Sequence, residues 1–500
     1  MVDLARVVKG AVSLRRFTIF KRLTMMTHDM TVLHRAFEAW MCGNALRQGR
    51  QRNKRFTFGD QWGDTTLTSD GRRVTDWERF SQAGTTPVTN NLIRQLVKTV
   101  VGRFRSQVID AEKPSDDALR EVRDANELDE LDARALEEFL ISGCCVQRVD
   151  IESTPTSGHR DVVVSNVNPN HLFVNAFLDP RGRDCRLVGQ LHSLPLSELL
   201  RRVAGGQRRK AAWVRRLYTE QTAERVAACA TQLGADSPIG NAFWHASEND
   251  LCRDIEVWTL ESQEVMVCHN RRTAQLEVLS PTEARKRRGN ADVKMRWDVD
   301  TRWHCRWFSP MGDLLMHTQA PAHPFVMRFY PLVDGEVHAL VEDVIDQQKY
   351  LNRLISLVDQ ALMASAKGVL IYPDTALPDG FTWAEVRRLW SSPGAILPYS
   401  PQLGDARPEQ MQSNGSNFGA YDMIALQMKL LEEVSGVHGA LQGKNVATGG
   451  SATLYQLQSQ NADLALTDLY DTFNAFRQQR NRLVAAMLDC ASDVSREVPT

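Results

Sequence analysis

The sequence predicts an α+β fold that is mainly helical, with one long helix and small β-rich sheets. The stretch GEVHALVEDVIDQQKYLNRLISLVDQALMAS, residues 335 to 365, contains no proline and no glycine after its first residue, and its apolar residues keep helical spacing. Short β-branched runs broken by turn residues recur between 160 and 195 and between 254 and 330. Amphipathic helical segments make up most of the remaining sequence.

The N-terminal part predicts helices that precede the first strands. Residues 28–50 have apolar residues at spacings of three and four, and a turn-rich segment follows at 56–80. The next helix lies in TTPVTNNLIRQLVKTVVGRFRSQ, with Thr89 or Asn90 as its N-cap. A charged helix pair that starts near residue 115 then leads into a strand.

The middle of the chain alternates between strands and helices. Strands joined by turns are predicted at 160–195, Arg-rich helices at 196–236, and strands again at 254–330. One short helix interrupts the second strand region, because Ser280 and Glu283 have the spacing of a capping box.

The long helix needs a partner outside a small core. Thirty helical residues extend roughly 45 Å, far beyond the mean helix of about 11 residues. A coiled coil, a strut between domains and a wall shared with copies of the chain are the three possibilities. Gln348 interrupts the apolar stripe at the position where a strict coiled coil would continue it, so a strut or a wall is favoured.

The C-terminal part predicts further strands, a loop and helices. KGVLIYP and GAILPYSP are expected to be strands on either side of a helix, and the polar stretch 403–420 is expected to be an exposed loop. A helix follows at 421–436. The last helices, after Ser451, use an apolar face of Leu454, Leu457, Leu464, Leu469, Phe473 and Phe476.

The composition indicates a packed protein with no general affinity for nucleic acid. Hydrophobic residues at 43% and charged residues at 24% are ordinary for globular proteins, and 500 residues suggest about three domains. Lys and Arg number 60 against 61 Asp and Glu, so any contact with DNA must be local. Basic runs such as GQRRKAAWVRR at 206–216 are most simply solvated faces.

The cysteines and the N-terminus favour a reducing compartment. Nine scattered cysteines without a CxxC pair suggest reduced thiols in a cytosol. Basic residues interrupt the apolar residues of the N-terminal segment, so a signal peptide is not expected there. No later window approaches the roughly 20 apolar residues that would span a bilayer.

The sequence offers little support for catalysis, and no cofactor, metal or catalytic residue is predicted. GALQGKN departs from the phosphate-loop pattern in spacing and in the residue after lysine. Cys268 with His269 and His304 with Cys305 could be written as a zinc site, but buried cysteines and surface histidines explain them better. Acidic residues of the long helix, Glu342 and Asp346 among them, most simply keep one face wet.

Several stretches, in their order along the chain, resemble portal proteins of short-tailed bacteriophages. They are FGDQW (58–62), TTPVTNNLIRQLVKTVVGRFRSQ (85–107), NVNPNHLFVNAFLDPRGRDCRLV (166–188), IEVWTLE (255–261), residues 334–371 around the long helix, and EVSGVHGALQGKNVATGGSATLYQLQSQ (433–460). Each motif is loose by itself, and their order is the specific part of the resemblance.

The resemblance implies a portal fold with wing, stem, clip and crown regions. These would be an N-terminal helical arm at 1–50, wing at 51–205, descending stem or wing at 206–250, clip at 251–333, ascending stem helix at 334–366, wing at 367–450 with a tunnel loop at 404–419, and crown at 451–500. Five residues would approach DNA: Lys349 and Arg353 in the stem, and Arg407, Asn414 and Asn417 in the loop. An ion pair with Asp343 or Asp346 is the alternative for the first two.

The function implied by the resemblance is that of a non-enzymatic DNA channel in the virion. A ring, commonly of twelve copies, would form at one capsid vertex, where double-stranded DNA is packaged and ejected. Expected partners are the terminase large subunit, head-completion and tail adaptor proteins, and major capsid and scaffolding proteins, with no membrane. Assembly would take place in the host cytoplasm. The alternatives are a metal-dependent enzyme acting on nucleic acid, using Glu342 and Asp346, and a helical scaffold or adaptor protein.

Overall fold

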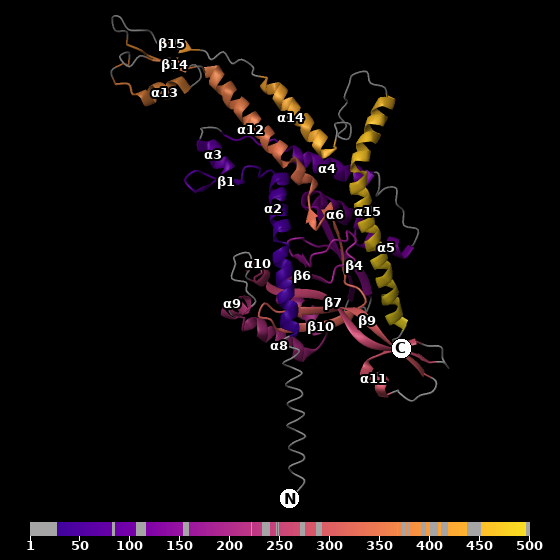
Figure 1. Ribbon diagram of the computed structural model, residues 1–500. Coiled ribbons are helices and arrows are strands. Elements are labelled where there is room, and N and C mark those ends of the chain that lie inside the picture. Colours follow the sequence, from indigo (N-terminus) through magenta and orange to yellow (C-terminus); the bar gives the residue numbers. More distant parts are fainter. Residues whose placement is uncertain are drawn as a thin grey trace. The chain divides into compact units, whose positions relative to one another are not determined.

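The fold mixes helices with antiparallel sheets, as the α+β prediction requires (Figure 1). The computed structural model describes residues 28–82, 86–106, 117–153, 160–221, 223–232, 241–246, 248, 250–270, 276–286, 293–367, 369–372, 377–378, 380–391, 397–400, 409–411, 419–437 and 452–496. They fall into two compact units. Unit 1 comprises Met1–Lys54, Val100–Glu342 and Leu466–Thr500, and unit 2 comprises Arg55–Thr99 and Asp343–Ala465.

Unit 1 contains two main antiparallel sheets. The six-stranded sheet has the order β10-β9-β7-β6-β5, with β8 also paired to β7. Its strands are β5 (Leu172–Val174), β6 (Leu187–Leu194), β7 (Cys252–Asn270), β8 (Leu276–Leu279), β9 (Val293–Phe308) and β10 (Leu314–Ala320). The three-stranded sheet has the order β11-β3-β4, from β3 (Cys144–Ser153), β4 (Arg160–Asn166) and β11 (Phe325–Phe329). Both sheets therefore pair strands from the predicted clip, 251–333, with strands from the predicted wing, 51–205.

The helices of unit 1 cover these sheets with apolar side chains. They include a helix over residues 28–42, α5 (Asp117–Ala125), α6 (Leu128–Ser142), α7 (Leu196–Ala204), α8 (Arg208–Thr219), α9 (Ala223–Gln232), α10 (Asn241–Trp244) and α11 (Pro281–Lys286). Val203 and Val214 of α7 and α8 join the core that contains Trp258 and Phe325. The described residues between 206 and 250 form only these short helices, with no long descending one.

The first helices differ in extent from the prediction. The helix expected at 28–50 turns at Gly43 and continues as α2 (Asn44–Phe58). The Arg47 guanidinium crosses this turn, donating to the Trp40 carbonyl oxygen at 2.6 Å and stacking on the Trp40 ring. The segment 56–80, predicted to be rich in turns, contains the end of α2, β1 (Thr65–Leu67), β2 (Arg73–Thr75) and the start of α3 (Asp76–Gln82).

Unit 2 is built mainly from helices. Helix α4 (Leu92–Phe104) begins in it, and its N-cap is Asn91 rather than Thr89 or Asn90, because Asn91 Oδ1 accepts from the Arg94 N–H at 3.1 Å. Other elements are α12 (Leu340–Lys367), β14 (Val369–Ile371), α13 (Trp383–Ser391), β15 (Glu409–Met411) and α14 (Ala420–Ser435). The boundary between the units falls inside α2, α4, α12 and α15.

The long helix exists but starts later than predicted. Residues 336–337, expected to be helical, form β13 (Glu336–Val337), which pairs with β12 (Leu332–Val333). Asp334 and Gly335 form the tight turn between them, both with positive φ, the conformation that an Asp-Gly hairpin turn requires. Helix α12 then runs for 28 residues, roughly 42 Å.

Three predictions in the C-terminal part differ from what the described residues show. The described residues of GAILPYSP, 397–400, form no strand, since Pro398 cannot donate to a sheet. The partner of β14 is β15, which lies within the predicted exposed loop. The last predicted helices are one helix, α15 (Ala452–Arg496), and its Leu464 side chain is 69% exposed rather than on the buried face.

The other predicted elements are confirmed. They include the α5–α6 pair leading into β3, the strands β4 to β6, the helices α7 to α9, and α11 with its capping box, in which Ser280 Oγ accepts from the Glu283 N–H at 3.3 Å. Among the described helices, none combines the length and the apolar character needed to cross a membrane.

Candidate functional site: the anchored face of helix α12

Helix α12 carries three buried polar residues spaced four apart, Gln348, Asn352 and Ser356, here called the polar ladder. Spacing of four places them on one side of the helix, one turn above another. They face the extended segment 86–91 that precedes α4. The polar ladder therefore replaces apolar packing on the part of α12 where Gln348 interrupts the apolar stripe.

The polar ladder supplies hydrogen-bond partners for backbone groups that no sheet or helix satisfies. Gln348 Oε1 accepts from the Leu92 N–H at 3.0 Å, and Gln348 Nε2 donates to the Asn90 carbonyl oxygen at 2.6 Å. Asn352 Oδ1 accepts from the Asn90 N–H at 3.1 Å, and Ser356 Oγ accepts from the Val88 N–H at 3.0 Å. Each hydrogen bond contributes modestly, and together these four contacts fix the segment against α12.

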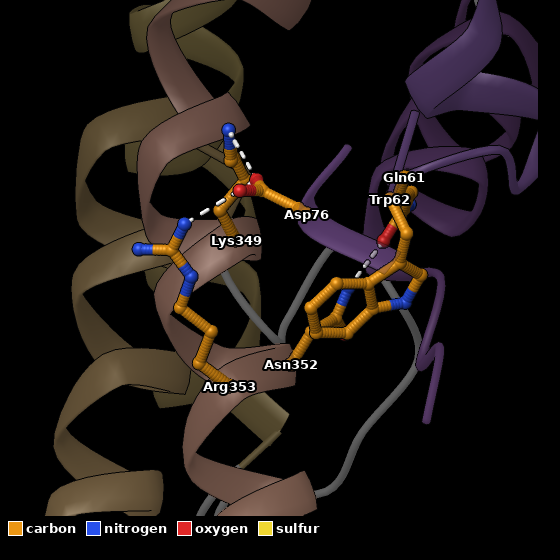
Figure 2. A pocket seen from close by; sticks show the side chains of 6 residues that line it. All are labelled: Gln61, Trp62, Asp76, Lys349, Asn352 and Arg353. Atoms are coloured by element: carbon orange, nitrogen blue, oxygen red, sulfur yellow. Dashed lines mark hydrogen bonds and ion pairs between the residues drawn. The ribbon is translucent and has the colours of Figure 1, made fainter. Parts of the chain in front are cut away.

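Two cations next to the polar ladder share acidic partners. Lys349 Nζ lies 2.9 Å from Asp64 Oδ2 and 3.2 Å from Asp76 Oδ2, and an Arg353 guanidinium nitrogen lies 3.3 Å from the same Asp76 oxygen. Asp76 is buried and opens α3, where a carboxylate also meets the positive end of the helix dipole. Figure 2 shows Lys349 and Arg353 converging on Asp76 from successive turns of α12.

The hollow beside these groups is narrow, because its own side chains fill most of it. Gln61, Trp62, Asp76, Lys349, Asn352 and Arg353 line it and leave no room for a ligand (Figure 2). Asn352 Nδ2 donates to Gln61 Oε1 at 2.5 Å, which joins the hollow to the polar ladder. The site therefore holds α12 in place rather than binding a small molecule.

The apolar residues of α12 are buried near its start and exposed farther along. Val341, Val344, Ile345 and Leu351 are buried, whereas Leu357 and Leu362 are each 52% exposed.

A second buried polar network links the two sheets of unit 1. Glu256 Oε2 contacts the Arg148 guanidinium and His192 Nε2, the latter at 2.7 Å, while Oε1 accepts from the indole Nε1–H of Trp258 at 2.8 Å. Burial alone would raise the pKa of Glu256, but Arg148 and His192 outweigh it and hold the pKa well below its ordinary value. Both carboxylate oxygens are occupied, so this network acts as a cross-link between β3 and β7.

A third network ties α15 to α6. Asp132 accepts from Arg477 Nε at 2.8 Å and contacts the Arg480 guanidinium, and all three side chains are buried. A buried carboxylate with two guanidinium partners is compensated, and the loss of one partner would leave a buried charge unpaired.

The structure does not assemble the possible zinc ligands. Cys305 and His304 of β9 lie opposite Trp258 and Thr259 of β7. Cys268 is about ten residues farther along β7, so the two Cys-His pairs lie far apart on the sheet. Both cysteines are buried and His269 is exposed, as expected, but His304 is buried, because it packs between Gln263 and His317. No group of three or more potential ligands in the described part of the chain could hold a metal ion.

The five residues predicted to approach DNA have different outcomes. Lys349 and Arg353 lie on α12 and pair with Asp64 and Asp76, with side chains 17% and 40% exposed. Arg407, Asn414 and Asn417 lie outside the described residues. The prediction that these five contact DNA stays a prediction.

Sequence reasoning missed the polar ladder, although a signal was present. It interpreted Gln348 as an interruption, whereas Gln348, Asn352 and Ser356 together form a regular polar stripe with a period of four. Asp64 and Asp76 lay in a segment interpreted as turns, so the spacing along α12 could not indicate them.

The chain matches a family model described as Phage P22-like portal protein over residues 33–495. None of the curated proteins with which the chain was compared matches it. The family match covers nearly the whole length, including both sheets of unit 1, the polar ladder and α12. The chain therefore belongs to the P22-like phage portal protein family.

Proposed function

We propose that copies of this chain form a ring-shaped channel at one capsid vertex, through which double-stranded DNA is packaged and ejected. Membership of the P22-like portal family is the observation that carries this proposal. In the same proposal the ring, commonly of twelve copies, lies in the virion, assembles in the host cytoplasm, and docks terminase, adaptor, capsid and scaffolding proteins. Its role is structural, with no reaction of its own.

The proposal gives α12 the role of the ascending stem helix. Its length of roughly 42 Å suits a channel wall, and its exposed leucines suit contact with neighbouring copies. The remaining regions follow the boundaries inferred from the sequence, with a clip at 251–333 and a crown at 451–500.

The near-zero net charge supports transport rather than retention of DNA. A wall dense in Arg and Lys would release counterions from DNA and hold it tightly. We propose that Lys349 and Arg353 keep their ion pairs with Asp64 and Asp76, which partly neutralise the two cations, so that their contacts with DNA are weak. Arg407, Asn414 and Asn417 are proposed to approach DNA from the tunnel loop.

Native mass spectrometry and electron microscopy of the purified protein test the proposal. A ring of about twelve 56.4 kDa chains with a central opening is the expected result. A monomer or a closed dimer at micromolar concentration, with no opening in projection, would contradict it.

A further inference from the structure

Helix α8 exposes a basic surface that the proposed channel does not explain. Arg208 and Arg215 are seven residues apart, as are Arg209 and Arg216, so each pair lies on nearly the same side of the helix, about 10 Å apart. All four are exposed, and Ala212 lies between the two pairs. Val214 and Leu217, on the opposite side, are buried in the core. The four arginines form what we call the basic face of α8.

Most of the basic face has no acidic partner within its own copy. Arg216 pairs with Glu220 at 2.7 Å, but no carboxylate in the described part of the chain pairs with Arg208, Arg209 or Arg215. Exposed Arg201 of α7, next to α8, also has none there. Unpaired like charges at this density repel one another, so a surface of opposite charge would relieve the repulsion.

Helix α5 of the same unit has the complementary surface. Asp117, Glu121 and Asp124 are spaced four and three apart on one exposed side, here called the acidic face of α5. Asp117 pairs with Arg120 at 3.1 Å, whereas Glu121 and Asp124 have no partner among the described residues. Asp117 and Asp124 are seven residues apart, the same separation as Arg208 and Arg215.

The two faces lie on different sides of unit 1. Helix α5 packs through Val122 on the core cluster that includes Val149 and Val164, and α8 packs through Val214 on the cluster that includes Trp258. Figure 1 draws α5 and α8 well apart within this unit. The faces are therefore two separate surfaces of one copy, as a contact between successive copies requires, in which one surface of each copy meets a different surface of the next.

We propose that the basic face of α8 docks on the acidic face of α5 of a neighbouring copy of this chain. The inference rests on the proposed ring and adds a contact within it. A second copy is favoured over duplex DNA because the chain itself provides the matching spacing of opposite charge. Trp213, 42% exposed beside the arginines, also favours a protein, since Trp and Arg are enriched at protein interfaces while a phosphate backbone offers little to an indole.

Charge reversal on each face tests the contact. The first variant combines Arg208→Glu with Arg215→Glu, and the second combines Glu121→Arg with Asp124→Arg. Each variant alone would place like charges opposite each other, so the concentration at half-assembly should rise about tenfold at low salt. The control combines Arg72→Glu with Arg73→Glu on the exposed β1–β2 hairpin and should assemble like wild type.

Mixing the two variants gives the decisive measurement. In an alternating ring each reversed face meets a reversed face of the other variant, so the mixture should assemble where neither variant does alone. Native mass spectrometry should show equal amounts of both variants. Thermal melting of the unassembled variants checks that each is folded.

The possible failures are distinguishable. Two outcomes would overturn the α8–α5 contact while the wild type still forms rings, which leaves the proposed function standing. Either both variants assemble normally, or mixing them does not restore assembly. Normal assembly with weaker binding of a DNA duplex by the α8 variant would assign the basic face to DNA and also overturn the contact. Wild type without rings would overturn the proposed function and, with it, this inference.

Discussion

At the scale of single residues, Gln348 shows how one polar side chain can fix a backbone segment. It is buried, and it accepts from the Leu92 N–H and donates to the Asn90 carbonyl oxygen and to Asn352. The apolar pattern of α12 predicted the helix correctly but gave this position no role. A polar residue inside an apolar stripe has a meaning only once its partner is known, and here the partner lies 256 residues away in sequence.

We expect Gln348→Ala to destabilise unit 2 by about 1–2 kcal/mol, because it removes the hydrogen bonds from Gln348 to the Leu92 N–H and the Asn90 carbonyl oxygen, which then keep only their bond to each other. Urea denaturation of the purified protein measures this change. Gln360→Ala, an exposed position on the same helix, is the matched control and should change stability by less than about 0.5 kcal/mol. Equal effects of the two substitutions would contradict the role assigned to the polar ladder.

Asp254 is a buried carboxylate whose oxygens have no hydrogen-bond partner in the described part of the chain. Burial raises its pKa from the ordinary 3.8 to about 6, and nearby His192 only partly offsets this. The folded state therefore binds a proton more tightly than the unfolded state does. The stability contributed by Asp254 is fully present below about pH 4 and is lost as the pH rises toward 6 and above.

Asp254→Asn should accordingly stabilise the protein at pH 7.5, by about 2–3 kcal/mol, and the gain should shrink as the pH falls toward 4. Thermal unfolding at pH 7.5 and pH 4.5 provides the comparison. Asp70→Asn, which removes the same charge at an exposed turn, serves as the control. A destabilised Asp254→Asn variant at pH 7.5 would mean that the carboxylate has a partner that the structure does not show.

At the scale of elements, the sequence predicted helices and strands well where one local signal dominated. The capping box at Ser280 and the helix pair leading into β3 are examples, since caps and periodicity act within a few residues. Predictions failed where proline or a tight turn overrode the pattern, as at Pro398 and at the Asp334–Gly335 turn. The partner of β14 depends on a pairing across 38 residues, for which short runs give no local signal.

Helix α15 shows that apolar periodicity predicts a helix but not which of its apolar side chains are buried. Phe473 is buried, with its ring 5.2 Å from Phe104 and 5.9 Å from Phe139, whereas Leu464 is exposed on the same helix. The predicted apolar face included both residues, because the sequence does not indicate where the rest of the fold stops covering a helix.

Truncation of these two side chains should therefore have unequal effects. Phe473→Ala should cost about 3–5 kcal/mol by opening a cavity beside Phe104, and Leu464→Ala should cost less than about 1 kcal/mol. Chemical denaturation followed by circular dichroism gives both values. A similar loss from both substitutions would contradict the burial described for α15.

At the scale of the whole molecule, the exposed leucines of α12 should matter for assembly more than for folding. Leu357→Glu places a charge where the proposed ring would bury it, while in a single copy the side chain is already half exposed. We expect the variant to melt like wild type but to remain monomeric in sedimentation velocity. Gln360→Glu, one turn away and also exposed, should still assemble.

The division of the sequence into units determines when unit 1 can complete its folding during synthesis. Unit 1 combines a segment near the start of the chain, a long middle segment and residues from Leu466 onward. Phe473, Arg477 and Arg480 emerge from the ribosome long after Phe104 and Asp132, the residues that they contact. A nascent chain stalled at residue 460 should leave Phe104 and Asp132 uncovered and be cut readily by protease, whereas the released chain resists. Translation itself would then delay the completion of unit 1 until α15 has been synthesised.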